Sequence, residues 1–303
     1  MRIYKQAITS TIVAILHVAS AAQAQSYVQH ENVVYHETDG VGLLMDVFTP
    51  KEKSNGLGIV DVISGAWHSD RSKIRDHARA QTFEILCRRG YTVFAVRPGS
   101  ITKFSVPEMV ANVKQGIRWV KTHADKYRID PDRLGLMGAS AGGHLACLAA
   151  VTFGGGESNS DNNGEIPDAS VQAVGVFFPV TDLLDFNGKA ADARAGDELS
   201  RLARRLAYPN GQGDASDEVV TQALTAMSPA RLVSPNAPPF LLIHGDADHV
   251  VPLQQSQLMV AALQKAGVSA ELIVKKGGGH PWFTIYEEVK VLADWFDKQL
   301  GKK

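Results

Sequence analysis

The chain has 303 residues, of which 45% are hydrophobic, and its formal net charge at pH 7 is −1. This composition is that of a globular protein with a buried core, and it excludes a chain that is disordered or fibrous as a whole. The near-neutral charge, without a basic block, excludes a nucleic-acid groove, because neutralising several phosphates takes clustered lysines and arginines. We therefore expect a small, weakly charged molecule as the partner, and the composition leaves the oligomeric state open.

Residues 1–24 have the three parts of an export signal. Arg2 and Lys5 precede an apolar stretch over residues 7–22, and Ala22-Gln23-Ala24 forms a small-residue cleavage site. A membrane anchor is the alternative, but the apolar stretch contains polar residues and falls short of the roughly 20 residues that span a bilayer. We expect cleavage before Gln25 and a periplasmic or secreted protein that has no membrane contact afterwards.

Strand and helix signals then follow in chain order, beginning with a strand pair at residues 32–38 and 43–48 around the turn dipeptide Asp39-Gly40. Further strands are expected at residues 58–64, 91–96, 133–137, 171–178, 239–244 and 270–274. Helices are expected at residues 76–89, 105–127, 141–151, 253–266 and 282–300, the second of them opening with a capping box at Ser105 and Glu108. This alternation predicts one α/β domain over residues 25–303, with a mostly parallel sheet covered by helices on both faces.

Two segments interrupt the alternation. Residues 154–165 are rich in Gly, Asn and Ser and are expected to form a surface loop. Residues 181–227 form an insertion with a basic helix near residues 199–206, whose charges are expected to face solvent. Because the insertion follows one strand and precedes the next, it is expected to form a small cap over the active site.

Cys87 and Cys147 are the two cysteines, and each lies in an apolar stretch with helical character. A disulfide would require their Cα atoms to approach within roughly 7 Å, which sequence cannot show, and two buried free thiols are favoured. The chain has no Cys or His spacing typical of a zinc site, so no metal is expected.

The strongest chemical signal is the Gly-Ala-Ser-Ala-Gly sequence at residues 138–142, which lies between a predicted strand and an apolar predicted helix. This is the setting of a nucleophile elbow, a sharp turn in which small neighbours let the central serine project from the sheet. The helix that follows favours negative charge at its first turn. Ser140 is therefore the predicted nucleophile.

A serine needs a base and an orienting carboxylate, which follow an elbow serine in the order acid, then histidine. Six of the ten histidines precede Ser140. His144 lies one helical turn after Ser140 and is expected to be structural, while His244 ends a strand and His249 adjoins the candidate acid. His280 remains, and the preceding Gly-Gly-Gly loop allows its imidazole to reach the elbow, so His280 is the predicted base.

Two aspartates compete for the acid position in the turn after the strand at residues 239–244. Asp248 lies deeper in the turn, from which it can reach a histidine on another loop. Asp246 is placed to accept hydrogen bonds from nearby backbone N–H groups, as turn aspartates do. Triad geometry favours Asp248 as the acid and leaves Asp246 as the alternative.

An oxyanion hole needs one backbone N–H from the residue after the nucleophile and a second from a loop after an earlier strand. Ala141 is the predicted source of the first. The turn at residues 64–67 is expected to supply the second from Gly65 or Ala66, with Trp67 as a candidate substrate contact. An ordinary turn in which Trp67 packs in the core is the alternative.

Together these motifs resemble the esterase and lipase branch of the α/β-hydrolase superfamily, in particular the hormone-sensitive-lipase-like group related to bacterial feruloyl and acetylxylan esterases. The resemblance covers nearly all of the chain after residue 24. It rests on the Gly-x-Ser-Ala-Gly-Gly-His elbow ending at His144, on the segment at residues 238–248, and on Gly279-His280. It implies an α/β-hydrolase fold and supports Asp248 as the acid. The family's His-Gly-Gly-Gly-Trp oxyanion loop reads Ile-Ser-Gly-Ala-Trp at residues 63–67, which leaves the shape of the acyl pocket open.

The leading hypothesis is a serine esterase that acts through an acyl-enzyme, without a cofactor, on small-molecule or carbohydrate esters such as acetyl or feruloyl esters. The first alternative is a serine peptidase of the prolyl-oligopeptidase kind, but those peptidases usually carry a propeller domain ahead of the hydrolase domain, and too few residues precede the first strand here. The second alternative is a catalytically silent protein that kept the fold. The intact set of serine, aspartate and histidine argues against it, because a silent protein has no physical need for all three residues.

Overall fold

A computed structural model describes residues 25–153, 167–188, 198–207 and 216–301 of the protein. The predicted export signal, the predicted loop at residues 154–165 and parts of the predicted cap lie outside the described residues. No helix in the described ranges is long and apolar enough to cross a membrane.

One eight-stranded sheet forms the centre of the molecule, in the order β1-β2-β4-β3-β5-β6-β7-β8. β1 and β2 are antiparallel to each other, and β2 is antiparallel to β4. The strands from β4 to β8 are parallel to one another, which confirms the predicted mostly parallel sheet. The strands are β1 (Tyr27–Thr38), β2 (Val41–Pro50), β3 (Gly58–Val62), β4 (Thr92–Val96), β5 (Leu134–Ala139), β6 (Ala173–Phe177), β7 (Phe240–Gly245) and β8 (Ala270–Lys275).

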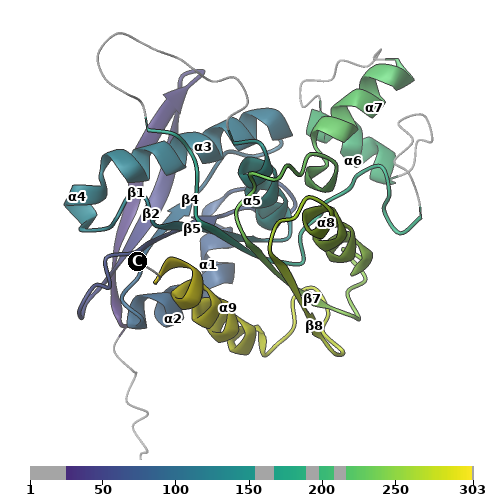
Figure 1. Ribbon diagram of the computed structural model, residues 1–303. Helices are drawn as coiled ribbons and strands as arrows, with labels where there is room; N and C mark the ends of the chain where they lie inside the picture. Colours follow the sequence, from purple (N-terminus) through teal and green to yellow (C-terminus); the bar gives the residue numbers. More distant parts are fainter. Residues whose placement is uncertain (1–24, 154–166, 189–197, 208–215, 302–303) are drawn as a thin grey trace, which may run out of the picture.

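Helices cover both faces of the sheet, as Figure 1 shows. α1 (Arg71–Arg79), α2 (Thr82–Arg88) and α9 (Ile285–Leu300) pack on one face. The helices α3 (Val106–Thr122), α4 (Ala124–Tyr127), α5 (Ala141–Val151) and α8 (Gln254–Lys265) lie on the other. The described helices of the predicted insertion are α6 (Glu198–Ala207) and α7 (Asp217–Ala226), which lie side by side at the upper right of Figure 1, and η1 (Pro229–Arg231) follows them.

The predicted helix at residues 76–89 is wrong as a single element. Asp70 caps α1 by accepting a hydrogen bond from the Ser72 N–H, so the first helix begins earlier than predicted. Gln81 has a φ of 58°, in the left-handed region that interrupts a right-handed helix, and a second helix begins after it. The capping box at Ser105 and Glu108 is confirmed, but that helix ends at Thr122 and α4 follows after His123.

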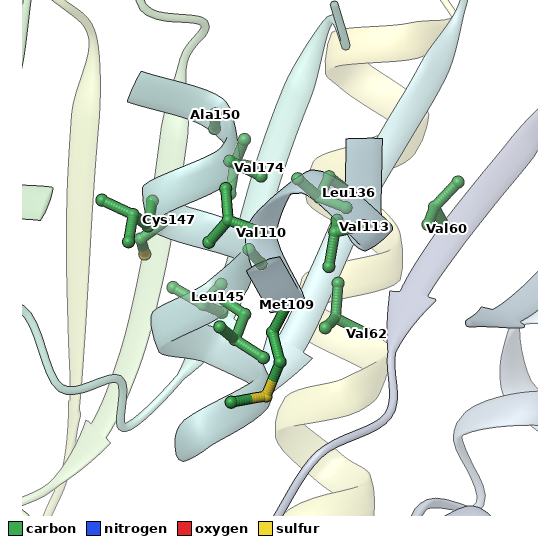
Figure 2. Packing of buried hydrophobic residues seen from close by; sticks show 14 of the residues in the cluster. Val60, Val62, Met109, Val110, Val113, Leu136, Leu145, Cys147, Ala150 and Val174 are labelled. Carbon is green, nitrogen blue, oxygen red and sulfur yellow. The ribbon is translucent and has the colours of Figure 1, made fainter. Parts of the chain in front are cut away.

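α5 is buried on all sides because it is apolar around its whole circumference. Its side chains meet those of α3 and of three central strands in one core cluster, shown in Figure 2. The labelled members are Val60, Val62, Met109, Val110, Val113, Leu136, Leu145, Cys147, Ala150 and Val174. This packing fixes the helix that starts at the predicted nucleophile, so the position of Ser140 is set by the core itself.

Cys87 and Cys147 are free and buried. Cys87 lies in α2 and Cys147 in α5, on opposite faces of the sheet. The prediction of two buried free thiols is confirmed.

A buried ion pair ties α1 to β3, the strand that leads into the predicted oxyanion loop. His77 Nδ1 lies 2.7 Å from Oδ2 of Asp61, which is fully buried. Burial alone would lower the pKa of His77, but the charge and hydrogen bond of Asp61, with a contribution from Asp76, raise it above its ordinary value. The pair therefore anchors α1 most strongly while His77 carries its proton.

Changing His77 to Gln should destabilise the protein more at pH 5.5 than at pH 8.5. A pKa raised on folding contributes stability that is fully present below the unfolded value of about 6.5 and is lost as pH rises through the folded value. Urea unfolding of wild type and H77Q at both pH values measures the difference. An equal cost at both pH values, or a larger cost at pH 8.5, would contradict the assignment of a charged pair.

Candidate active site

Ser140 lies at the junction of β5 and α5 in a backbone conformation that few residues adopt. Its φ is 54° and its ψ is −121°, and its N–H donates to the carbonyl of Phe177 at 2.9 Å. The glycines around it are required by close backbone approach: a Cβ on Gly138 would lie 2.5 Å from the Gly142 carbonyl oxygen, and one on Gly142 would lie 2.3 Å from the Val62 carbonyl oxygen. The turn has the strained geometry of a nucleophile elbow.

Three side chains from three loops meet at this elbow. His280 Nε2 lies 2.9 Å from Ser140 Oγ, and His280 Nδ1 lies 2.7 Å from Asp248 Oδ2. Because an ionised carboxylate only accepts hydrogen bonds, the imidazole carries its proton on Nδ1 and offers the lone pair of Nε2 to the serine hydroxyl. The structure thus brings the predicted nucleophile, base and acid into one hydrogen-bonded chain.

Asp248 is held as a carboxylate by several donors. Its Oδ1 accepts the N–H groups of Val250 at 2.8 Å and Val251 at 2.9 Å, and its Oδ2 lies 3.4 Å from His244 Nε2. Burial alone would raise the pKa of Asp248, but the hydrogen bonds from His244, His280 and the two backbone N–H groups outweigh it and keep the pKa well below its usual range. Asp248 therefore stays ionised and supplies the negative charge that orients His280.

Asp246 takes a different position from Asp248. Its Oδ1 accepts the N–H of Gly277 at 2.6 Å, and its own N–H donates to the carbonyl of Lys275 at 3.1 Å. The neighbouring Ala247 N–H donates to the Gly278 carbonyl at 2.9 Å. Asp246 thus joins the turn after β7 to the loop before His280, in the turn role considered for it.

The predicted oxyanion loop follows β3 and touches the start of α5. The Gly142 N–H donates to the Ser64 carbonyl at 3.0 Å, which connects the two backbones. The Gly65 N–H donates to the His68 carbonyl at 2.9 Å, so the prediction that Gly65 stabilises the oxyanion is corrected: its only N–H has an acceptor within the loop. The N–H of Ala66 has no acceptor among the described residues, and Ala141, as the first residue of α5, has no helical carbonyl to bond.

The sequence matches BD-FAE over residues 45–263, which is more than half of the chain. The chain belongs to the BD-FAE family. The predicted resemblance to the esterase branch of the α/β-hydrolases is confirmed, and the strand order and parallel sheet are those of an α/β-hydrolase fold.

Several relatives of this BD-FAE chain carry esterase names. Esterase LipC of Mycobacterium tuberculosis (strain ATCC 25618 / H37Rv) is 27% identical over 268 residues, which are 87% of this chain and 62% of LipC. The chain spans about half the length of the curated relatives it matches. A solved structure titled as a truncated form of a carbohydrate esterase from gut microbiota is 27% identical with a TM-score of 0.77, and the match covers 92% of this chain and 99% of that one.

A second solved relative of the BD-FAE chain is esterase 2 of Thermogutta terrifontis phosphonylated by sarin. It is 26% identical with a TM-score of 0.67, and the match covers 89% of this chain and 95% of the solved one. These relatives support the prediction of a carboxylic-ester hydrolase that acts on small-molecule esters.

Phe178 packs against the His280 imidazole, and Trp282 packs against Phe178. The Phe178 ring lies 4.3 Å from the His280 ring, centroid to centroid, and 5.9 Å from the Trp282 ring. Trp282 is buried and donates its indole N–H to Glu288 at 2.7 Å. Neither contact was predicted from the sequence, although Trp282 follows the base by two positions and Phe178 directly follows β6.

His244 is excluded as the catalytic base by its position at the end of a strand, but it contacts the triad acid Asp248. It is fully buried, and its Nε2 donates to the Val251 carbonyl at 2.9 Å while lying 3.4 Å from Asp248 Oδ2. Its Nδ1 pairs with Ser256 Oγ at 2.7 Å. The sequence signal for this contact is the spacing: His244 lies four residues before Asp248, across a tight turn.

Trp67 packs in the hydrophobic core. The residue is 6% exposed and belongs to the core cluster, and its indole N–H donates to His144 Nδ1 at 3.0 Å. An indole buried to this extent gives no support to the predicted substrate contact, and the alternative of core packing describes it. The described residues also contain no group of three or more His, Cys, Asp or Glu side chains able to hold a metal ion.

Proposed function

We propose that the domain hydrolyses carboxylic esters by acyl transfer, with Ser140 as nucleophile, His280 as general base and acid, and Asp248 as the orienting carboxylate. The observation that carries the proposal is the hydrogen-bonded chain from Ser140 Oγ through both nitrogens of His280 to Asp248 Oδ2. A serine hydroxyl becomes an effective nucleophile when an adjacent base accepts its proton and a third group orients that base.

The geometry supports a two-stage reaction. His280 Nε2 takes the hydroxyl proton as Ser140 Oγ attacks the ester carbonyl, and the imidazolium is stabilised by Asp248. The N–H groups of Ala141 and Ala66 hydrogen-bond the oxyanion of the tetrahedral intermediate. The intermediate then collapses, His280 gives the proton to the departing alcohol, and an acyl-enzyme remains on Ser140. Water attacks the acyl group with the same proton transfers, which releases the acid and regenerates the hydroxyl.

For the substrate class we propose acetyl or feruloyl esters of carbohydrates. The support is the likeness to the carbohydrate esterase from gut microbiota, which matches nearly the whole of both chains. We further propose that the insertion at residues 181–227 acts as a small cap that favours short acyl groups, and that the domain works in the periplasm or medium after removal of residues 1–24.

A panel of esters and amides tests the proposal. Purified protein is assayed on para-nitrophenyl acetate, acetylated xylan, methyl ferulate and a peptide amide, with Ser140→Ala as the background. We expect turnover of the esters, no turnover of the amide, and a phosphonyl adduct at Ser140 after treatment with an organophosphonate, located by peptide mass spectrometry. Equal ester turnover by Ser140→Ala, or an adduct on another residue, would contradict the serine mechanism, whereas faster turnover of the amide would favour the peptidase alternative.

A further inference from the structure

We infer that His144 is a positioning residue of the oxyanion hole, which holds Trp67 and thereby directs the N–H of Ala66 toward the reacting carbonyl. The inference rests on the proposed serine mechanism and assigns a role within it to a buried histidine that the triad does not use.

His144 connects three separate parts of the chain. It lies in the first turn of α5, where its N–H donates to the Ser140 carbonyl at 2.9 Å. Its Nδ1 accepts the indole N–H of Trp67 at 3.0 Å, and its Nε2 donates to the Met227 carbonyl at 2.7 Å. Met227 caps the C-terminal end of α7. One imidazole thus joins the oxyanion loop and the described end of the insertion to the helix that begins at the nucleophile.

The oxyanion loop needs contacts with residues outside the loop to keep its conformation, because its backbone is strained. Ala66 has a φ of 48° and Trp67 a φ of 58°, so two consecutive non-glycine residues occupy the left-handed region. Side chains with a Cβ pay a steric cost there, and such conformations persist only where the surroundings over-determine them. Trp67 is held by its hydrogen bond to His144, by an edge-on contact with the His144 ring at 5.6 Å between centroids, and by packing in the core cluster. The Ile101 N–H also donates to the Trp67 carbonyl at 2.8 Å.

The chemistry of His144 suits this task because it is fixed in one protonation state. Burial lowers its pKa to about 4, against an opposing effect of the hydrogen bond to the Met227 carbonyl, so the ring is neutral at neutral pH. The Met227 carbonyl only accepts, which places the proton on Nε2 and leaves Nδ1 free to accept from Trp67. A lysine or arginine at this position offers no hydrogen-bond acceptor, and an aliphatic residue offers neither a donor nor an acceptor.

A positioning role differs from a purely structural one in what it does to catalysis. In the proposed mechanism the Ala66 N–H donates to the oxyanion of the transition state, so a misdirected N–H should lower kcat and kcat/KM together and leave KM nearly unchanged. Complete loss of one oxyanion donor costs roughly 10²- to 10³-fold in kcat. Since the Ala66 N–H stays in place but loses its direction, we expect about a 10- to 100-fold loss.

The experiment compares four single variants and one double variant of the full chain with wild type. We expect His144→Leu and Trp67→Phe each to lower kcat about 10- to 100-fold and to weaken binding of a boronic acid transition-state analogue by the same factor. The double variant should fall no further than the worse single variant, because both changes break the same hydrogen bond. His144→Gln keeps an acceptor and a donor and should recover most of kcat. Cys147→Ala, one turn along the same buried helix, should lower the melting temperature without changing kcat.

Trp67→Phe keeps an aromatic ring in the core, so it tests the inference even where His144→Leu fails to fold. Wild-type kcat in Trp67→Phe would overturn the inference. The same holds for additive losses in the double variant, for a kcat loss in Cys147→Ala as large as in His144→Leu, and for failure of His144→Gln to recover activity while folded. Full activity of Ser140→Ala would instead refute the serine mechanism, whatever the His144 variants show.

Discussion

Replacing Ser140 by alanine should lower kcat about 10⁶-fold while leaving the protein folded. Loss of a triad serine removes covalent catalysis entirely, and only substrate binding and the oxyanion donors continue to accelerate the reaction with water. The change removes one oxygen atom and its hydrogen bond to His280, and the small side chain still fits the elbow. Initial rates on para-nitrophenyl acetate, with far-ultraviolet circular dichroism to confirm the fold, measure the effect.

Ser105→Ala is the matched control because it removes another serine hydroxyl with a defined role. Ser105 caps α3, and loss of such a cap typically costs about 1 kcal/mol of stability. We therefore expect a lower melting temperature with an unchanged kcat for Ser105→Ala, and the reverse for Ser140→Ala. A Ser140→Ala variant that loses less than about tenfold in kcat would show that another group is the nucleophile.

Asp248→Asn should lower kcat about 10⁴-fold, the typical cost of such a change in a triad. An amide keeps the size of the carboxylate, but it loses the negative charge that stabilises the imidazolium and it lets His280 adopt the wrong tautomer. Its carbonyl can still accept the N–H groups of Val250 and Val251, so the turn should survive. kcat and melting temperature measured together separate the catalytic loss from any loss of folding.

Asp246→Asn is the control for this second prediction, because Asp246 lies two residues away and binds the Gly277 N–H instead of the imidazole. Weakening that contact should cost roughly 1 kcal/mol of stability, with little effect on kcat. An active Asp248→Asn beside a folded but inactive Asp246→Asn would reverse the assignment of the acid.

The sequence predicted regular elements best where a single local pattern was strong. α5 was predicted at its observed bounds because it is almost entirely apolar and because it follows an elbow in which positions 138 and 142 have room only for glycine. The break at Gln81 was missed because a left-handed glutamine has no recognisable sequence signal, and it depends on how α1 and α2 pack against the sheet.

For the site, chain order and loop composition selected Ser140 and His280, whereas Asp248 was favoured over Asp246 by triad geometry and by the family resemblance. The structure brings Ser140, His280 and Asp248 within hydrogen-bonding distance. The sequence could not show which backbone N–H groups of the oxyanion loop are hydrogen-bonded within the loop itself. Whether Gly65 or Ala66 faces the reacting atoms depends on the pairing of Gly65 with His68, a tertiary detail of one turn. The hydrogen bond between Trp67 and His144 joins residues 77 positions apart, and no local pattern encodes it.

The two cysteines make the protein a convenient starting point for site-directed labelling. Burial raises the pKa of the Cys87 thiol to about 12 and also raises that of Cys147, so neither presents the thiolate that reacts with maleimides and similar reagents. A single cysteine introduced at Phe283, which is 96% exposed and three residues after His280, would therefore carry a dye without removal of the native thiols. Fluorescence from that position would report when a substrate arrives beside the histidine loop.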